Sequence, residues 1–198
     1  MDKQYLSNVM TSGEAAMHAI NQNKFGKLFF HLGPPRDTSV FEKVKNNKTN
    51  INACDFILCT GLFDGHENDL HYYKNFLTKH ASKKLVCTNP DLTVHRGNKE
   101  EYCAGYVAKI FEELGGKVTY YGKPHKEIYE MCFKEDEKVL AIGDNLRTDI
   151  KGANNLNKDC LFISNGVHRN EFSNKLELEK LCEKYKVKAN YFQKELQW

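Results

Sequence analysis

Residues 139–150 read Val-Leu-Ala-Ile-Gly-Asp-Asn-Leu-Arg-Thr-Asp-Ile, an apolar run that ends in the pattern G-D-x-x-x-x-D. Val139 to Ile142 predicts a buried strand, and Thr148 to Asn155 predicts the helix after it. Ligands of α/β proteins bind at the carboxyl ends of the strands, so we expect Asp144 at that edge and Asp149 in the first helical turn. The stretch therefore predicts an α/β unit with two carboxylates at one sheet edge.

Two carboxylates at such an edge suit a hard cation such as Mg²⁺, which prefers oxygen ligands and keeps several of its waters. A structural reading is equally consistent with the spacing. In that reading Asp144 is a turn residue, and Asp149 is a favourable charge near a helix N-terminus. The spacing alone leaves both readings open.

A second motif, Tyr121-Gly122-Lys123-Pro124-His125, follows one predicted strand and precedes a predicted helix. Pro124 suits the start of a helix, where its missing N–H does no harm. A lysine at a sheet edge can neutralise a bound phosphate, although a lone Gly-Lys-Pro tripeptide is also typical of an ordinary surface. The acidic motif about twenty residues downstream favours the phosphate interpretation.

The rest of the chain alternates apolar strand-like runs with helical periods, which predicts βαβ units and a largely parallel sheet. The expected strands are 27–32, 55–59, 84–88, 117–121, 139–142 and 160–164, with an edge strand or tail at 189–198. The expected helices are 14–21, 69–80, 100–114, 126–133, 148–155 and 174–185. We place a domain boundary near Tyr121 to Lys123, which divides the chain into 1–121 and 122–198.

Composition narrows the function classes. The 198 residues carry a net charge of +3, with lysines scattered among acidic residues, which does not favour nucleic-acid binding. No apolar run is long enough to span a membrane, and residues 1–12 lack an export signal, so we expect no membrane association and a cytoplasmic location. The seven cysteines include no C-x-x-C pair, so neither structural zinc nor a disulfide framework is expected.

Several further motifs agree in order and spacing with one known family. They are Cys87-Thr88-Asn89-Pro90-Asp91, His95-Arg96-Gly97-Asn98, Tyr102-Cys103-Ala104-Gly105, Gly115-Gly116-Lys117-Val118, Gly152-Ala153-Asn154 and Asn165-Gly166-Val167-His168. Together with the two motifs above, they resemble the class IIA hydrolases of the haloacid dehalogenase superfamily, in the group similar to p-nitrophenyl phosphatases and nucleotide phosphatases. The resemblance extends from about Thr11 to Val167.

The resemblance implies a Rossmann-like core with a large α/β cap inserted in it. By that resemblance residues 1–121 are a cap with a short lead-in, and 122–198 are the C-terminal part of the core. Lys123 would screen the charge of a phosphoryl group, Asp144 and Asp149 would hold Mg²⁺, and Asn145 would order the outer shell of the ion.

Asn89 and Asp91 would lie on a cap loop that borders the substrate pocket, if the resemblance extends to this loop. The alternative is a turn in which an Asx side chain and a proline close a strand, without contact to substrate. The sequence favours the turn slightly.

The family reaction uses an N-terminal strand that ends in D-x-D, and its first aspartate attacks phosphorus. This sequence has no such strand. Asp2 follows no strand, and Phe56 to Asp64 lacks the second carboxylate and matches the cap. The chain thus resembles an N-terminally truncated member of the family, and we expect little activity from it alone.

Two functions remain open. The first is a Mg²⁺-dependent phosphate monoesterase that acts through an aspartyl-phosphate on a small phosphorylated metabolite, with the nucleophile supplied by a complementing N-terminal polypeptide. The second is a non-catalytic interaction module, the remnant of a split phosphatase, which could associate as a homodimer through an open sheet edge. A response-regulator-like phosphoacceptor is disfavoured, because the early acidic pair of such domains is missing.

Overall fold

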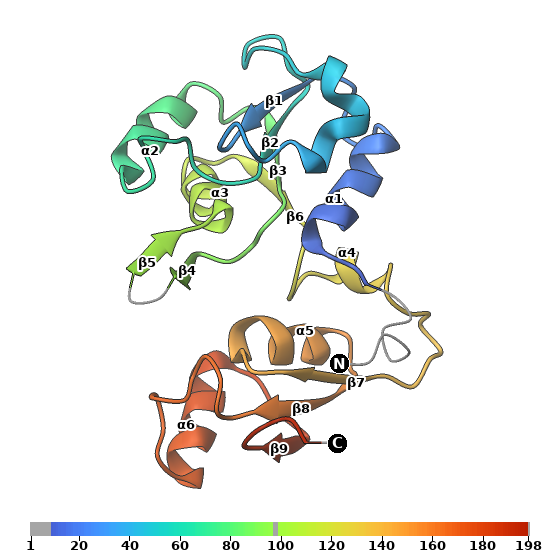
Figure 1. The fold of residues 1–198 in the computed structure, drawn as a ribbon, viewed down its shortest axis with the longest axis vertical. Helices are drawn as coiled ribbons and strands as arrows, with labels where there is room; N and C mark the ends of the chain where they lie inside the picture. Colours follow the sequence, from blue (N-terminus) through green and yellow to red (C-terminus); the bar gives the residue numbers. More distant parts are fainter. Residues whose placement is uncertain (1–8, 97–98, 198) are drawn as a thin grey trace. The chain divides into compact units, whose positions relative to one another are not determined.

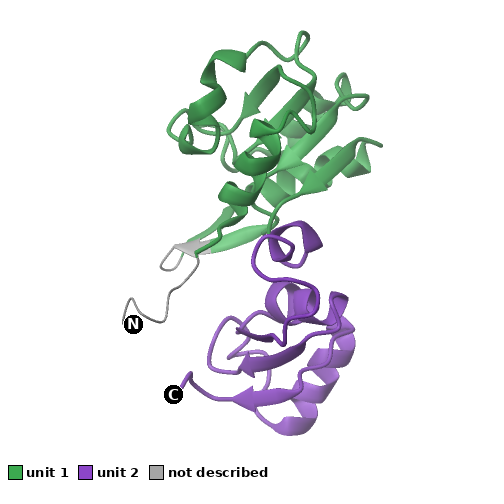
Figure 2. Cartoon of the chain, turned by 90° about the vertical axis from the view of Figure 1, so that its right-hand side faces the viewer, with its two compact units in different colours: residues 1–122 green, residues 123–198 purple. Residues whose placement is uncertain are grey.

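The computed structural model describes residues 9–96 and 99–197. The chain divides into two compact units, residues 1–122 and 123–198, which Figure 2 shows in green and purple. The break lies within the boundary region expected from the sequence. That the first unit is a cap and the second a partial core stays a prediction.

Unit 1 is built around a parallel sheet with the strand order β1-β2-β3-β6. Its elements are α1 (Ser12–Asn21), β1 (Phe29–Leu32), the 3-10 helix η2 (Ser39–Asn47), β2 (Phe56–Cys59), α2 (Leu70–Thr78), β3 (Lys84–Cys87), β4 (Thr93–Arg96), β5 (Lys99–Tyr102), α3 (Ala104–Glu113) and β6 (Lys117–Tyr120). The four sheet strands lie where the apolar runs predicted them.

Both faces of the unit 1 sheet are covered. Ile57 and Leu85 point to the face where α2 and α3 supply Tyr73 and Phe111, all fully buried in one core. Figure 1 shows α2 and α3 on one side of the sheet and α1 on the other. On that second side Phe29 packs 5.2 Å, ring centre to ring centre, from a phenylalanine of η2. Helices on both faces are what a parallel sheet requires.

The structure corrects one helix expected in unit 1. Residues 100–114 were expected to be helical throughout, but Lys99–Tyr102 forms β5, which pairs antiparallel with β4 in a two-stranded hairpin. The helix α3 begins only at Ala104, after its N-cap Cys103. Lys99, Glu100 and Glu101 fill the first three positions of β5, so the strand lacks the alternating apolar pattern by which strands are recognised.

Unit 2 contains a smaller parallel sheet with the order β7-β8-β9. Its elements are α4 (Lys126–Tyr129), β7 (Leu140–Gly143), the π-helical turn η3 (Leu146–Ile150), α5 (Lys151–Asn155), β8 (Asp159–Ile163), α6 (Lys175–Tyr185) and β9 (Tyr191–Gln193). The expected series of strands and helices is present and the last segment is an edge strand, but the helix expected at 126–133 extends only over Lys126–Tyr129. Mixed α/β architecture with parallel sheets is therefore confirmed for the chain.

The core of unit 2 lies on one face of this sheet. Cys160 and Phe162 of β8 are fully buried against Leu146 and Ile150 of η3 and Leu178 of α6. The neighbouring positions in the strands point the other way. The opposite side of the sheet carries seven residues by register, including Asp159 and Gln193. We define the open face as its five apolar residues: Leu140, Ile142, Leu161, Ile163 and Tyr191.

The open face is poorly covered. Leu140 is 48% exposed, Ile142 41% and Tyr191 55%, and the other two residues are only partly buried. Within residues 9–96 and 99–197, β7 pairs with β8 alone, so one of its edges is free of strand partners.

None of the helices described in the structure is long and apolar enough to cross a membrane.

Candidate functional site

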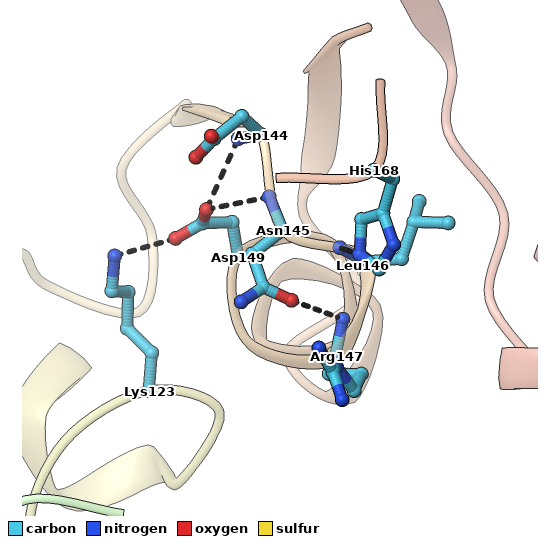
Figure 3. A network of polar contacts seen from close by, with 7 residues as sticks. All are labelled: Lys123, Asp144, Asn145, Leu146, Arg147, Asp149 and His168. Carbon is cyan, nitrogen blue, oxygen red and sulfur yellow. Dashed lines mark hydrogen bonds and ion pairs between the residues drawn. The ribbon is translucent and has the colours of Figure 1, made fainter. Parts of the chain in front are cut away.

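The four predicted core-site residues Lys123, Asp144, Asn145 and Asp149 meet at the carboxyl end of β7 (Figure 3). The Lys123 Nζ lies 2.5 Å from Oδ1 of Asp149, across 26 residues of sequence. The backbone amides of Asp144 and Asn145 each donate to Oδ2 of Asp149 over 3.1 Å. The predicted juxtaposition of the lysine with the acidic motif is therefore present in unit 2.

Asp149 is a buried anchor of this site. Its side chain is only 9% exposed, and both of its oxygens accept hydrogen bonds. Gly143 makes this burial feasible, because a Cβ at that position would lie 2.2 Å from the Asp149 carboxyl carbon. Through these hydrogen bonds Asp149 connects the β7–η3 turn to Lys123. Loss of the bonds would leave a buried charge without partners, which is strongly destabilising.

Asp144 has a more open environment. Its Oδ2 accepts a hydrogen bond of 2.9 Å from the amide of Val167, while Oδ1 has no hydrogen-bond partner among the residues that the structure describes. Gly166 allows the close approach, since a Cβ there would lie 2.2 Å from Asp144 Oδ2. One carboxylate oxygen thus remains available at the sheet edge for a cation, a water or a substrate group.

Asn145 serves the local fold. It is the N-cap of η3, and its Oδ1 accepts a 2.9 Å hydrogen bond from the Arg147 amide. An Asn at this position satisfies one of the free N–H groups at the start of a helical turn. Its predicted place in the outer shell of a metal ion stays a prediction.

His168 ends a motif that the sequence analysis singled out, Asn165 to His168, but the sequence assigned it no role in the site. It is completely buried, and its Nε2 lies 3.1 Å from the amide nitrogen of Leu146. The backbone N–H can only donate, so Nε2 accepts, and Nδ1 carries the proton toward Glu171 Oε1 at 2.6 Å. A single histidine after a strand has no distinctive spacing, and only the fold shows that it supports the start of η3.

Tyr129 of α4 also borders the site. Burial raises the pKa of its hydroxyl, and the nearby carboxylate of Asp149 raises it further. The side chain packs against Gly152 of α5, where a Cβ would lie 1.9 Å from the tyrosine oxygen. The neutral ring therefore forms a fixed wall beside the Lys123–Asp149 pair.

The donor set fits a weakly held hard cation. Asp144 offers one carboxylate oxygen, and Mg²⁺ is commonly held by one or two carboxylates with several waters. Asp149 would have to release a partner before it could coordinate an ion directly. In the part of the chain that the structure describes, no group of three or more His, Cys, Asp or Glu side chains could hold a metal.

The predicted substrate residues belong to unit 1. Asn89 and Asp91 follow β3, and the amide of Asp91 donates 3.1 Å to the side-chain oxygen of Asn89. This contact forms the turn that the sequence favoured. Gly105 of α3 lets the turn approach the helix, because a Cβ there would lie 2.2 Å from the Pro90 carbonyl oxygen. A role in substrate binding stays a prediction.

The sequence and the structure of this chain are similar to those of known hydrolases. A family model described as HAD-hydrolase-like matches residues 120–188, which include the whole site around Lys123. A solved haloacid dehalogenase-like hydrolase from Brucella suis 1330 is 25% identical with a TM-score of 0.78, and covers 99% of this chain and 74% of its own. The predicted resemblance to the haloacid dehalogenase superfamily is confirmed by these matches.

Two further similar proteins are named as phosphatases. The ribonucleotide monophosphatase NagD of Escherichia coli K12 is 27% identical over 123 residues, which are 60% of this chain and 47% of NagD. The p-nitrophenyl phosphatase from Archaeoglobus fulgidus shares the fold at a TM-score of 0.67 and 14% identity, covering 93% of this chain and 70% of that one. The chain thus spans about half the length of NagD.

Proposed function

We propose that this chain supplies the charge-screening and cation-binding part of a class IIA phosphate monoesterase for small phosphorylated metabolites. The observation that carries the proposal is the convergence of Lys123, Asp144 and Asp149 at the carboxyl end of β7. The similarity to a ribonucleotide monophosphatase supports the substrate class.

Each residue has a distinct task in the proposed reaction. The Lys123 side chain is 52% exposed, so its ammonium can donate to a phosphoryl oxygen while its ion pair with Asp149 keeps it in place. Asp144 directs its available oxygen to the same edge. A bound Mg²⁺ would neutralise charge on the phosphoryl oxygens and help to orient them.

The attacking carboxylate is not part of this set. None of the described strands ends in D-x-D, and Asp2, which the sequence analysis weighed, lies outside the described residues. Loss of a nucleophile from a covalent mechanism costs on the order of 10⁶ in turnover. We therefore infer that the nucleophile comes from a segment outside this sequence, either further residues of a longer chain or a separate polypeptide.

An assay of p-nitrophenyl phosphate hydrolysis with Mg²⁺ tests the proposal. We expect background rates from the 198-residue chain alone. Activity should appear when the residues of the Brucella suis hydrolase that have no counterpart in this chain are added as a separate polypeptide. Lys123→Met and Asp144→Asn should each abolish the restored activity, whereas Asp136→Asn, at an exposed position, should leave it unchanged.

Two results would contradict the proposal. The first is turnover by the chain alone at the rate of an intact relative, lost on Asp144→Ala, which would show that it contains its own nucleophile. The second is a stable complex with the added polypeptide that stays inactive at every Mg²⁺ concentration. That result would favour a non-catalytic interaction module, which the exposed Leu140 and Ile142 also support.

A further inference from the structure

The direction of the Asp144 carboxylate depends on one neighbouring amide. Its Oδ2 accepts the 2.9 Å hydrogen bond from the Val167 N–H, and among residues 9–96 and 99–197 neither carboxylate oxygen has another hydrogen-bond partner. A carboxylate held by a single hydrogen bond can still turn, so the place of the Val167 amide decides where Oδ1 points. The Val167 side chain is 53% exposed, so its burial does little to hold that amide in place.

The residue after Val167 fixes this part of the backbone. His168 is completely buried, and its Nε2 accepts a hydrogen bond of 3.1 Å from the Leu146 amide (Figure 3). Two consecutive residues of the loop between β8 and α6 therefore hold the turn between β7 and η3, one at Asp144 and the other two residues later. A displaced imidazole would displace the Val167 amide as well, because a planar peptide unit joins the two residues.

Glu171 selects the protonation form of the imidazole. Its Oε1 lies 2.6 Å from Nδ1 of His168, and its amide donates a 2.9 Å hydrogen bond to the His168 carbonyl oxygen, which closes a turn. A carboxylate can only accept, so it favours the tautomer with the proton on Nδ1 and leaves Nε2 as the acceptor for the Leu146 amide. The other tautomer would place two N–H groups against each other in a buried position.

The same glutamate connects the loop to the end of α6. The Tyr185 hydroxyl donates to Oε2 of Glu171 over 3.5 Å, and the Tyr185 ring lies 5.4 Å from the imidazole, ring centre to ring centre. The guanidinium of Arg147, the residue after Leu146, lies 5.8 Å from the centre of the same tyrosine ring. The contacts thus lead from η3 through the end of α6 and the loop back to η3.

We propose that His168 and Glu171 are positioning residues for the cation that Asp144 binds. Glu171 keeps the proton of His168 on Nδ1, so that Nε2 accepts from the Leu146 amide. The Val167 amide, fixed by that contact, then directs Oδ1 of Asp144 to the sheet edge. Neither side chain hydrogen-bonds to the Asp144 carboxylate, so both act through the backbone.

The nature of the cation rests on the proposed function, whereas the tautomer and the Val167 contact can be measured without any cation. Groups that hold a metal ligand without touching the metal typically change metal affinity by about 10- to 100-fold. A histidine that only stabilised the fold would leave the affinity of the folded chain unchanged. Cation affinity and stability therefore have to be measured separately.

Nitrogen NMR of the imidazole and hydrogen exchange of the Val167 amide test the positioning in the full 198-residue chain. We expect a protonated Nδ1, an unprotonated Nε2 and a protected Val167 amide. His168→Leu should speed that exchange at least about tenfold, whereas His168→Gln should change it less than about threefold, because the glutamine oxygen can replace Nε2 as the acceptor. Glu171→Ala should also speed the exchange, and Glu183→Ala, at an exposed position of α6, should not.

Titration with Mg²⁺ alone, followed by the NMR shift of the Asp144 amide, measures the effect on the cation. His168→Leu should weaken binding by about 10- to 100-fold, and His168→Gln by less than about threefold. Leu181→Ala is the control for lost stability, because its buried side chain belongs to the core of unit 2 and makes none of the contacts above. It should destabilise unit 2 and leave the Mg²⁺ affinity of the folded chain unchanged.

The outcomes separate the two proposals. If His168→Leu does not fold, Glu171→Ala replaces it, since the Glu171 side chain is 37% exposed. A proton on Nε2, unchanged exchange of the Val167 amide in Glu171→Ala, or an equal loss of Mg²⁺ affinity in Leu181→Ala would each overturn the positioning role. If the unchanged chain shows no response to Mg²⁺ at Asp144, the proposed function is contradicted, and the tautomer and the Val167 exchange still decide the positioning role.

Discussion

The two units of this chain contain the same kind of parallel sheet in different states of completeness. In unit 1 all four residues of β2 are buried, and helices lie on both faces of the sheet. In unit 2 the residues of β7 alternate between exposed and partly buried, and the helices lie on one face. The residues of the candidate site therefore lie in the unit whose sheet is less covered.

The largest expected difference is in the stability that each unit loses when one isoleucine of its sheet is replaced by alanine. Ile57→Ala should lower the stability of unit 1 by about 3 to 4 kcal/mol, because the side chain is fully buried. Ile142→Ala should cost less than about 1 kcal/mol in the chain alone, because much of the side chain is already in water. Opening free energies from hydrogen exchange, resolved for each unit, measure both. Equal costs would show that the two sheets are equally covered.

The next effect concerns the anchor of the site. Asp149→Ala should destabilise unit 2 by about 3 kcal/mol, since it removes a buried acceptor from two amides and from Lys123. Unit 1 should be unaffected. Asp136→Ala, at an exposed position, is the matched control and should change neither unit. Urea unfolding followed by hydrogen exchange distinguishes the units, and a loss below about 1 kcal/mol would refute the anchoring role.

Acid should affect unit 1 through His31. Burial lowers the pKa of His31 to about 4, and the charge of Lys48 lowers it further. Between pH 6.5 and 4 the unfolded chain binds the proton more readily, so the contribution of His31 to stability falls as the pH falls. From pH 7 to about 4.5 we expect a loss of about 2 kcal/mol. The loss should be absent in His31→Asn, and identical pH profiles for the two proteins would contradict the assignment.

The smallest expected effects come from a matched pair of helix caps. Thr11 forms a capping box with Glu14 at α1 in unit 1, and Asn145 caps η3 in unit 2. Replacement of either residue by alanine should cost about 1 kcal/mol in its own unit. Thermal unfolding monitored by hydrogen exchange measures each cost. If Asn145→Ala had no effect on stability, the Arg147 amide would have to be satisfied in another way.

The elements that sequence predicted well are those with strong apolar patterns. The strands at 29–32, 56–59 and 84–87 lie within the predicted apolar runs, because burial of both sheet faces favours continuous apolar sequence. The strands at 117–120 and 140–143 also lie within or beside the predicted runs, although they are less buried. The β4–β5 hairpin was missed because three consecutive charged residues at the start of β5 hide the strand pattern, although Tyr102 packs on the core. The 3-10 helix η2 was missed because it contains only one buried residue, Phe41.

The site was predictable in part. Spacing and strand position were sufficient to bring Lys123 and Asp149 together. They did not reveal that two backbone amides saturate Asp149, or that His168 supports the Leu146 amide, because both contacts depend on how the β7–η3 turn folds. The uncovered face of unit 2 was equally hidden, since Leu140 and Ile142 have the sequence pattern of a buried strand.

Hydrogen exchange of β7 and β2 in the isolated, monomeric chain is the most direct test of the contrast between the units. Our interpretation predicts that the amides of Leu140–Gly143 that do not donate to β8 exchange at nearly unprotected rates, while those of Phe56–Cys59 are at least about 100-fold slower. Uniform protection of β7, equal to that of β2, would contradict the open edge and the uncovered face of the unit 2 sheet.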